Sequence, residues 1–186
     1  MRDPRRVGIL ISGRGSNMRA LVENAISYEV ALVVSNKPRA PGLEWARAHG
    51  LPTWSQDSKG AEKEAYDRVV SAVLDEQSVG TIALAGFMRI LSPWFVEEWR
   101  GRIVNIHPSL LPKYRGLDTH ARAIDAGDKI AGCSVHIVTD ELDAGEVLGQ
   151  TEVPIEPGET PASLEQRVLL AEHALYPRLL NEFVCR

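Results

Sequence analysis

Residues 7–18 read VGILISGRGSNM, and this stretch decides the expected fold. Its first five residues are apolar and suit a buried strand, and the glycine-containing turn after them leads into a helical pattern over residues 17–27. A buried strand joined by a short turn to a helix is typical of a fold in which strands and helices alternate.

The same alternation continues outward along the chain. Further strands are expected over residues 30–34, 81–85, 103–106, 133–138 and 147–153. Helices are expected over residues 41–49, 62–77, 93–100, about 118–127 and 160–183. Pro177 is expected to kink the last helix or end it early. The pattern predicts one α/β domain over residues 1–186, with a mostly parallel sheet and helices on both faces.

Composition narrows the class of protein. The chain has 186 residues, of which 44% are hydrophobic and 25% charged, and its net charge is -4. This composition excludes a disordered chain and provides no overall positive field for nucleic acid. Two distant cysteines form no disulfide framework, and neither an export signal nor a membrane-spanning run is found. We expect a cytoplasmic protein without nucleic-acid or membrane partners, present as a monomer or homodimer.

The turn at residues 11–17 suits an anion. Its glycines allow close approach of the backbone, and free N–H groups at a helix start bind anions. A dinucleotide fingerprint is absent, because Met18 occupies the position of the third glycine and no acidic residue follows the second strand. We prefer the phosphate of a mononucleotide-sized ligand; a tight turn without a ligand is the alternative.

Asn105 and His107 stand at the carboxyl end of a predicted strand. Residues two apart on a strand point the same way, about 6.6 Å apart along the chain, so an amide and an imidazole can converge on one oxygen. Open α/β sheets bind ligands beyond such strand ends. The alternative is a hydrogen-bonded loop histidine. The loop over residues 108–118 that follows is long, and loops of that kind often carry function.

The strand over residues 133–138 leads into an acidic turn with Asp140, Glu141 and Asp143. These residues are either solvated turn residues or partners of His107. A carboxylate near His107 would favour the imidazolium form, which can act as an acid. The five histidines lack the spacing of zinc ligands, and no nucleophile elbow is present, so we expect neither a metal site nor a serine hydrolase.

Six ordered blocks together resemble a known family. They are ISGRGSN (11–17), SNKPRAPGLEWARAHG (35–50), LAGFMRILSP (84–93), NIHPSLLPKYRGLDTH (105–120), SVHIVTDELDAGEVLGQ (134–150) and AEHALYP (171–177). With these blocks the chain resembles the phosphoribosylglycinamide formyltransferases, or glycinamide ribonucleotide transformylases, of the folate-dependent formyltransferase family. The resemblance implies a Rossmann-like fold and transfer of a formyl group from 10-formyltetrahydrofolate, as cosubstrate, to the amine of glycinamide ribonucleotide in purine biosynthesis.

The resemblance also implies site residues. Asn105, His107 and Asp143 form the catalytic trio, without a metal. Residues that bind glycinamide ribonucleotide are Gly15, Ser16, Asn17 and Glu172. Residues that bind the reduced folate are Lys63, Met88, Arg89, Ile90, Leu91, Asn105, Thr139, Asp140, Glu141, Leu142 and Asp143. Residues of about 1–100 then form a phosphate-binding half, and those of about 101–186 a catalytic and folate-binding half.

Four positions depart from the family pattern. Lys63 stands in place of an arginine that contacts folate, Arg115 replaces a proline, Asp118 a histidine, and Leu169 a polar residue near the nucleotide. Lysine offers a point charge where arginine offers a fork, so the change at Lys63 is expected to alter affinity for a carboxylate.

Three other functions fit parts of the pattern. Formyltetrahydrofolate hydrolase uses a similar trio but transfers the formyl group to water, and it usually adds an amino-terminal domain. Methionyl-tRNA formyltransferase normally carries an additional carboxyl-terminal domain. A non-catalytic nucleotide-binding domain would need the phosphate turn but not the trio.

Overall fold

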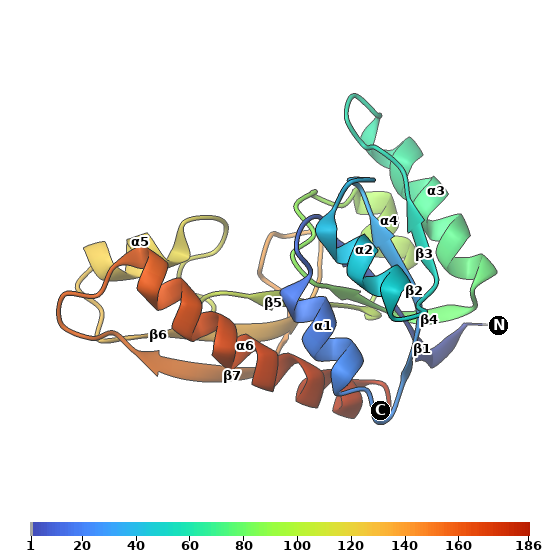
Figure 1. Ribbon diagram of the computed structural model, residues 1–186. Helices are drawn as coiled ribbons and strands as arrows, with labels where there is room; N and C mark the ends of the chain where they lie inside the picture. Colours follow the sequence, from blue (N-terminus) through green and yellow to red (C-terminus); the bar gives the residue numbers. More distant parts are fainter. Residues whose placement is uncertain (1) are drawn as a thin grey trace.

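The computed structural model describes residues 2–186 and contains one seven-stranded sheet (Figure 1). The strand order is β3-β2-β1-β4-β5-β6-β7. The pairs from β3 to β5 are parallel, whereas β6 and β7 are antiparallel to their neighbours. The strands are β1 (Asp3–Ile11), β2 (Glu29–Ser35), β3 (Thr53–Ser55), β4 (Val79–Leu84), β5 (Ile103–His107), β6 (Ile130–Ile137) and β7 (Val147–Pro154).

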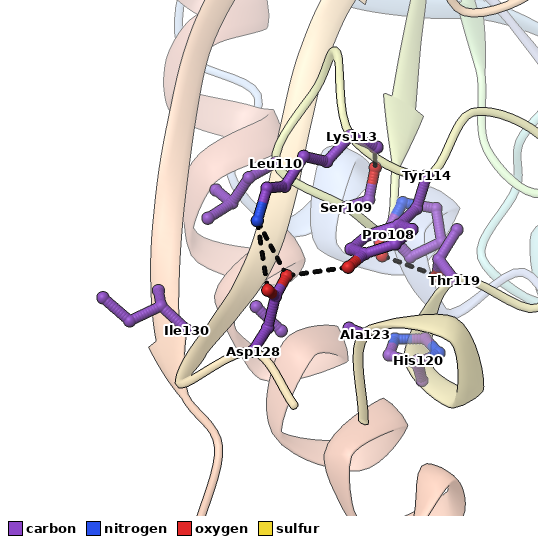
Figure 2. A pocket seen from close by; sticks show the side chains of 11 residues that line it. Pro108, Ser109, Leu110, Lys113, Tyr114, Thr119, His120, Ala123, Asp128 and Ile130 are labelled. Carbon is purple, nitrogen blue, oxygen red and sulfur yellow. Dashed lines mark hydrogen bonds and ion pairs between the residues drawn. The ribbon is translucent and has the colours of Figure 1, made fainter. Parts of the chain in front are cut away.

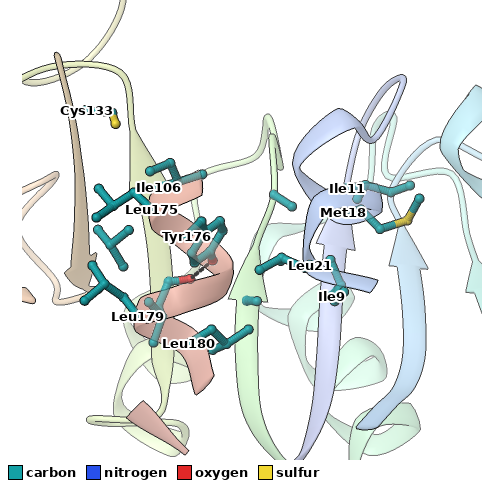
Figure 3. Close-up of a cluster of buried hydrophobic side chains, with 14 of the residues drawn as sticks. Ile9, Ile11, Met18, Leu21, Ile106, Cys133, Leu175, Tyr176, Leu179 and Leu180 are labelled. Atoms are coloured by element: carbon teal, nitrogen blue, oxygen red, sulfur yellow. Dashed lines mark hydrogen bonds between the residues drawn. The ribbon is translucent and has the colours of Figure 1, made fainter. Parts of the chain in front are cut away.

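Six helices follow the predicted alternation. They are α1 (Ser16–Glu23), α2 (Pro41–Ala48), α3 (Lys63–Glu76), α4 (Pro93–Glu98), α5 (Thr119–Asp125) and α6 (Pro161–Phe183). Apolar residues of α1, α2 and α6 pack on one face of the sheet, in the cluster drawn in part in Figure 3. Residues of α3 and α4 pack on the other face. The predicted fold class, a mostly parallel sheet with helices on both faces, is confirmed. No helix within residues 2–186 combines the length and hydropathy of a membrane span.

Alternation along β5 separates apolar from polar side chains. Val104 and Ile106 join the cluster beneath α6, while Asn105 and His107 point to the opposite face. On β6, His136 and Ser134 are the cross-strand partners of Asn105 and His107, and both are buried. This part of the second face is therefore lined by polar groups.

Helix α1 is shorter than expected: it ends at Glu23, whereas the helical pattern in the sequence extends to residue 27. The amide of Asn181 on α6 accounts for the early end. Its Oδ1 accepts hydrogen bonds from the backbone N–H groups of Ile26 and Ser27, at 2.9 and 2.7 Å. Its Nδ2 donates to the carbonyl of Asn24 at 2.9 Å. A tertiary contact thus satisfies the backbone groups that a longer helix would have used.

Three other expectations need correction. Strand β3 was not predicted, because three half-buried residues are too short to show an alternating pattern. Strand β1 begins at Asp3 and not at Val7, since Asp3 pairs with Val79 of β4. Pro177 does not end α6, which continues to Phe183; the helix beyond it packs Leu179 and Leu180 into the core, and this burial outweighs the lost backbone hydrogen bond.

Candidate active site

The site begins at the carboxyl end of β5, where Asn105 and His107 stand. Strand register fixes their positions, because both lie opposite residues of β6. His107 is 5% exposed, so its ring is held inside the protein. The loop over residues 108–118 and the segment over 138–146 lie against this strand end and supply its polar partners.

His107 faces acceptors on both sides of its ring. The Nδ1 atom lies 3.4 Å from Oδ2 of Asp143, and Nε2 lies 3.0 Å from the carbonyl oxygen of Tyr114. Asp143 is itself held in place, because its Oδ2 accepts a hydrogen bond of 2.9 Å from the backbone N–H of Gly116. The structure therefore brings His107 and Asp143 together, as the sequence predicted.

The third predicted residue, Asn105, connects to Asp143 through a histidine that sequence reasoning missed. Its Nδ2 donates to Nε2 of His136 at 3.1 Å, and that Nε2 lies 3.6 Å from Oδ1 of Asp143. The Nδ1 atom of His136 bonds the carbonyl of Ile137 at 3.0 Å. The available signal for His136 was its position in a mostly apolar strand, two residues after Ser134 and therefore on the same face.

Burial determines the state of His136. Loss of solvation lowers the pKa of this 2% exposed imidazole below its usual value, although the hydrogen bond to the Ile137 carbonyl and the charge of Asp143 oppose this shift. A neutral ring that donates from Nδ1 has a free lone pair on Nε2. That lone pair accepts the amide proton of Asn105 and orients the amide.

The turn after β1 offers backbone donors. Gly15 directly precedes α1 and has a φ of 72°, in the left-handed region that favours glycine. A Cβ on Gly42 would lie 3.0 Å from the carbonyl of Gly13 and 2.6 Å from Ile11, so α2 packs closely behind the turn. Ser16 and Asn17 form the first turn of α1, where N–H groups are free to bind an anion.

Glu172 reaches this turn from α6. Its Oε2 accepts a hydrogen bond of 2.7 Å from Nδ2 of Asn17, and both side chains are buried. Burial raises the pKa of Glu172 to about 7, even though the bond from Asn17 opposes the shift. The predicted ribonucleotide residues Asn17 and Glu172 are thus brought together.

The predicted folate segment around Met88 joins the same turn. The N–H of Met88 donates to Oγ of Ser12 at 2.7 Å, and that Oγ donates to Oδ1 of Asn36 at 2.6 Å. Met88 and Ile90 are 71% and 68% exposed, and Leu142 on the acidic turn is also exposed. Exposed apolar side chains near a polar site are suited to a flat aromatic ligand.

Two other predicted folate residues, Lys63 and Arg89, lie away from the trio. Lys63 opens α3 and is exposed. The guanidinium of Arg89 is turned inward, since its Nε lies 3.8 Å from Oδ1 of the buried Asp67 and its Cζ lies 4.7 Å from the ring centroid of Tyr66. The Arg89 side chain therefore braces its loop against α3, and neither residue contacts the trio.

Three further predicted folate residues, Thr139, Asp140 and Glu141, belong to the acidic turn. Thr139 Oγ1 donates to the carbonyl of Glu141 at 3.2 Å, and the Glu141 carboxylate pairs with Arg115 at the surface. Asp140 is exposed, and Leu91 is half-buried against the core beneath α3 and α4.

Within residues 2–186, no cluster of three or more His, Cys, Asp or Glu side chains is arranged to hold a metal ion.

Comparison with known proteins places these residues in a family. The family model described as formyl transferase matches residues 5–180. Phosphoribosylglycinamide formyltransferase from Escherichia coli is 47% identical over 94% of this chain and 85% of its own length. Trifunctional purine biosynthetic protein adenosine-3 from Drosophila melanogaster is 47% identical over 97% of this chain, which spans only 14% of that relative's length.

Solved structures agree with the sequence comparison. The crystal structure of phosphoribosylglycinamide formyltransferase from Brucella melitensis superposes with a TM-score of 0.92 and is 46% identical, over 100% of this chain and 97% of that one. The resemblance that the six sequence blocks indicate is thereby confirmed, and the chain belongs to the formyl transferase family.

Proposed function

We propose that this protein transfers the formyl group of 10-formyltetrahydrofolate to the amine of glycinamide ribonucleotide, a step of purine biosynthesis. The observation that carries the proposal is the assembly of Asn105, His107 and Asp143 at the end of β5. Family membership and the names of the relatives support the same reaction.

The chemistry follows from the groups present. The amine nitrogen of the ribonucleotide attacks the formyl carbon, and a tetrahedral intermediate with an oxyanion forms. The amide N–H of Asn105 and the protonated ring of His107 donate hydrogen bonds to this oxyanion. Asp143 stabilises the imidazolium and, through a water molecule, helps to move the proton from the amine to N10 of the folate. The bond between N10 and the formyl carbon then breaks, without a covalent enzyme intermediate or a metal.

The two substrates would bind on either side of the trio. Gly15, Ser16 and Asn17 would hold the phosphate, and Glu172 would meet the ribonucleotide. The reduced folate would lie on Met88–Leu91 and on the turn from Thr139 to Asp143, with Lys63 near its carboxylates. Residues of about 1–100 would then bind phosphate, and those of about 101–186 would bind folate and carry out the reaction.

The wider setting is also part of the proposal. The chain's composition favours a cytoplasmic location, with the ribonucleotide and the folate as its small-molecule partners. The protein would act as a monomer or homodimer. Nucleic acid and membranes are not expected to bind, since the net charge of -4 supplies no general attraction to a polyanion.

An optical assay of deformylation tests the proposal. Purified protein is mixed with a 10-formyl folate, with and without glycinamide ribonucleotide, and the same mixtures are run with His107→Ala. We expect turnover only when the ribonucleotide is present, and loss of turnover in the variant. Turnover without the ribonucleotide would instead identify water as the acceptor and the protein as a hydrolase. No turnover in any mixture would favour a non-catalytic nucleotide-binding domain.

A further inference from the structure

The backbone of Tyr114 is held in an uncommon conformation beside the site. Its φ is 55°, in the left-handed region that bulky residues rarely adopt. In this conformation its carbonyl accepts a hydrogen bond from Nε2 of His107 at 3.0 Å. A strained residue persists only when its neighbours hold it, so the contacts that fix Tyr114 also fix the position of this carbonyl.

Asp128, in the connection between α5 and β6, supplies the principal contact. Its Oδ2 accepts a hydrogen bond of 2.8 Å from the hydroxyl of Tyr114 and lies 2.9 Å from Nζ of Lys113 (Figure 2). The N–H of Asp128 donates to the carbonyl of Ala123 on α5 at 3.1 Å, which ties the carboxylate to a regular element. The bonds from Lys113 and Tyr114 hold the pKa of Asp128 below its usual value, so the carboxylate is ionised at neutral pH.

Two further contacts close the loop around Tyr114. The guanidinium carbon of Arg122 lies 5.2 Å from the Tyr114 ring centroid, and its Nη1 donates to the carbonyls of Arg115 and Leu117 at 2.7 and 3.1 Å. On the preceding side, Oγ of Ser109 donates to the carbonyl of Lys113 at 2.6 Å. The backbone on both sides of Tyr114 is therefore fixed, and Asp128 holds the side chain between them.

The Tyr114 carbonyl restricts how the His107 ring can carry its proton. A carbonyl oxygen only accepts hydrogen bonds, so Nε2 must be the donor in this contact. A neutral ring then has its single proton on Nε2 and its lone pair on Nδ1, which faces Asp143. Protonation of the ring adds the second proton at Nδ1. This nitrogen is the one from which His107 would donate a hydrogen bond to substrate.

We propose that Asp128 is a positioning residue for His107: it fixes Tyr114, whose carbonyl selects the Nε2–H tautomer and leaves Nδ1 as the atom that gains and loses the proton. The tautomer selection depends only on the free protein. The effect on turnover rests on the proposed role of His107 in formyl transfer.

Long-range proton–nitrogen NMR of the histidine rings tests the tautomer directly, without substrate. Spectra of protein labelled with nitrogen-15 in histidine are recorded at a pH where His107 is neutral, and His107→Gln identifies its signals. We expect wild-type protein to show the Nε2–H form. Asp128→Ala and Tyr114→Phe, which each remove the hydroxyl–carboxylate bond, should show a mixture of both tautomers.

Matched variants separate positioning from a general loss of structure. Asp128→Asn keeps an acceptor for the Tyr114 hydroxyl and should retain the wild-type tautomer. Lys113→Met removes the ion pair with Asp128 and the contact of Nζ with the Tyr114 ring, but it leaves the bond between the Tyr114 hydroxyl and Asp128 and should also retain the wild-type tautomer. Asp125→Ala removes an exposed carboxylate of α5 that has no side-chain partner among the described contacts and should match wild type. Thermal unfolding of each variant verifies that it is folded.

Turnover supplies the second readout. We expect Asp128→Ala and Tyr114→Phe to lower kcat about tenfold, the effect of one charge-assisted hydrogen bond, with KM values within about twofold of wild type. An unchanged tautomer in folded Asp128→Ala and Tyr114→Phe would overturn the proposal, as would an equal loss in Asp125→Ala. If no variant catalyses formyl transfer but the tautomers follow the expected pattern, the proposed function fails while the positioning by Asp128 stands.

Discussion

One face of the sheet is covered in two different ways along its width. Over β1, β2 and β4, apolar side chains such as Leu10, Val34 and Ile82 pack against α3 and α4. Over β5 and β6, the same face carries Asn105, His107 and His136, and loops cover it. The first region is held together by burial of apolar area, which is largely non-directional. The second depends on hydrogen bonds, which require each group to find a partner at a fixed angle.

Ser134 shows how completely the buried polar groups of this region are hydrogen-bonded. Its hydroxyl donates to the carbonyl of Ser109 at 2.6 Å and accepts from the N–H of Leu111 at 3.0 Å and from Nε2 of Gln150 at 2.8 Å. One buried hydroxyl thereby positions the start of the loop that covers His107. Substitutions in the apolar region should therefore change stability, whereas those in the polar region should change turnover.

The largest expected effect tests the polar region. Asn105→Ala removes the amide that we propose as a donor to the oxyanion, so kcat should fall by about hundredfold to thousandfold, equivalent to about 3 to 4 kcal/mol in transition-state stabilisation. The deformylation assay with saturating substrates measures this change. A decrease confined to thermal stability, with kcat preserved, would show that the amide only fills space beside His136.

The matching test in the apolar region is Leu74→Ala. Leu74 is fully buried beneath the sheet, and its truncation removes methyl groups and leaves a cavity. The free energy of unfolding should fall by about 3 kcal/mol, as measured by urea denaturation, while kcat at 25 °C stays near that of wild type. A large loss of kcat in the folded variant would contradict the division between the two regions.

The third prediction concerns the pH dependence of stability that the buried carboxyl of Glu172 causes. The pKa of this carboxyl is about 7 in the folded protein, whereas a solvated glutamate in the unfolded chain has a pKa of 4.5. The folded state therefore binds the proton more tightly than the unfolded state. Its contribution to stability is therefore fully present below pH 4.5 and is lost as pH rises towards 7, by about 2 to 3 kcal/mol. Urea denaturation at pH 5 and pH 8 should show this decline in wild type and not in Glu172→Gln. Parallel pH dependences would indicate an ordinary pKa for this carboxyl.

The smallest expected effect lies at the surface of the polar region. Arg115 pairs with Glu141, and both side chains are at least 40% exposed. Arg115→Ala should change the free energy of unfolding by less than about 0.5 kcal/mol, because solvent screens exposed pairs. A loss of several kcal/mol in urea denaturation would show that this pair anchors the acidic turn. Surface contacts of the polar region would then contribute to stability as well.

Sequence patterns predicted the apolar region more completely than the polar one. Burial of helices and strands repeats with fixed periods, so β1, β2, α2 and α3 could be located within a few residues. Helix α1 ended earlier than its pattern suggested, because Asn181 captures the chain that follows it. His136 was missed because its role depends on the strand register that sets it opposite Asn105.

The sequence by itself determined the fold class and the glycine-containing turn after the first strand, and it supplied the candidates Asn105, His107 and Asp143, since local patterns and ordered motifs encode these features. Only the tertiary structure decided which side chains meet. It joined Glu172 to Asn17, His136 to Asn105, and Asp128, through Tyr114, to His107. The physical reason is that a hydrogen bond depends on distance and angle in space, which separation along the chain does not specify.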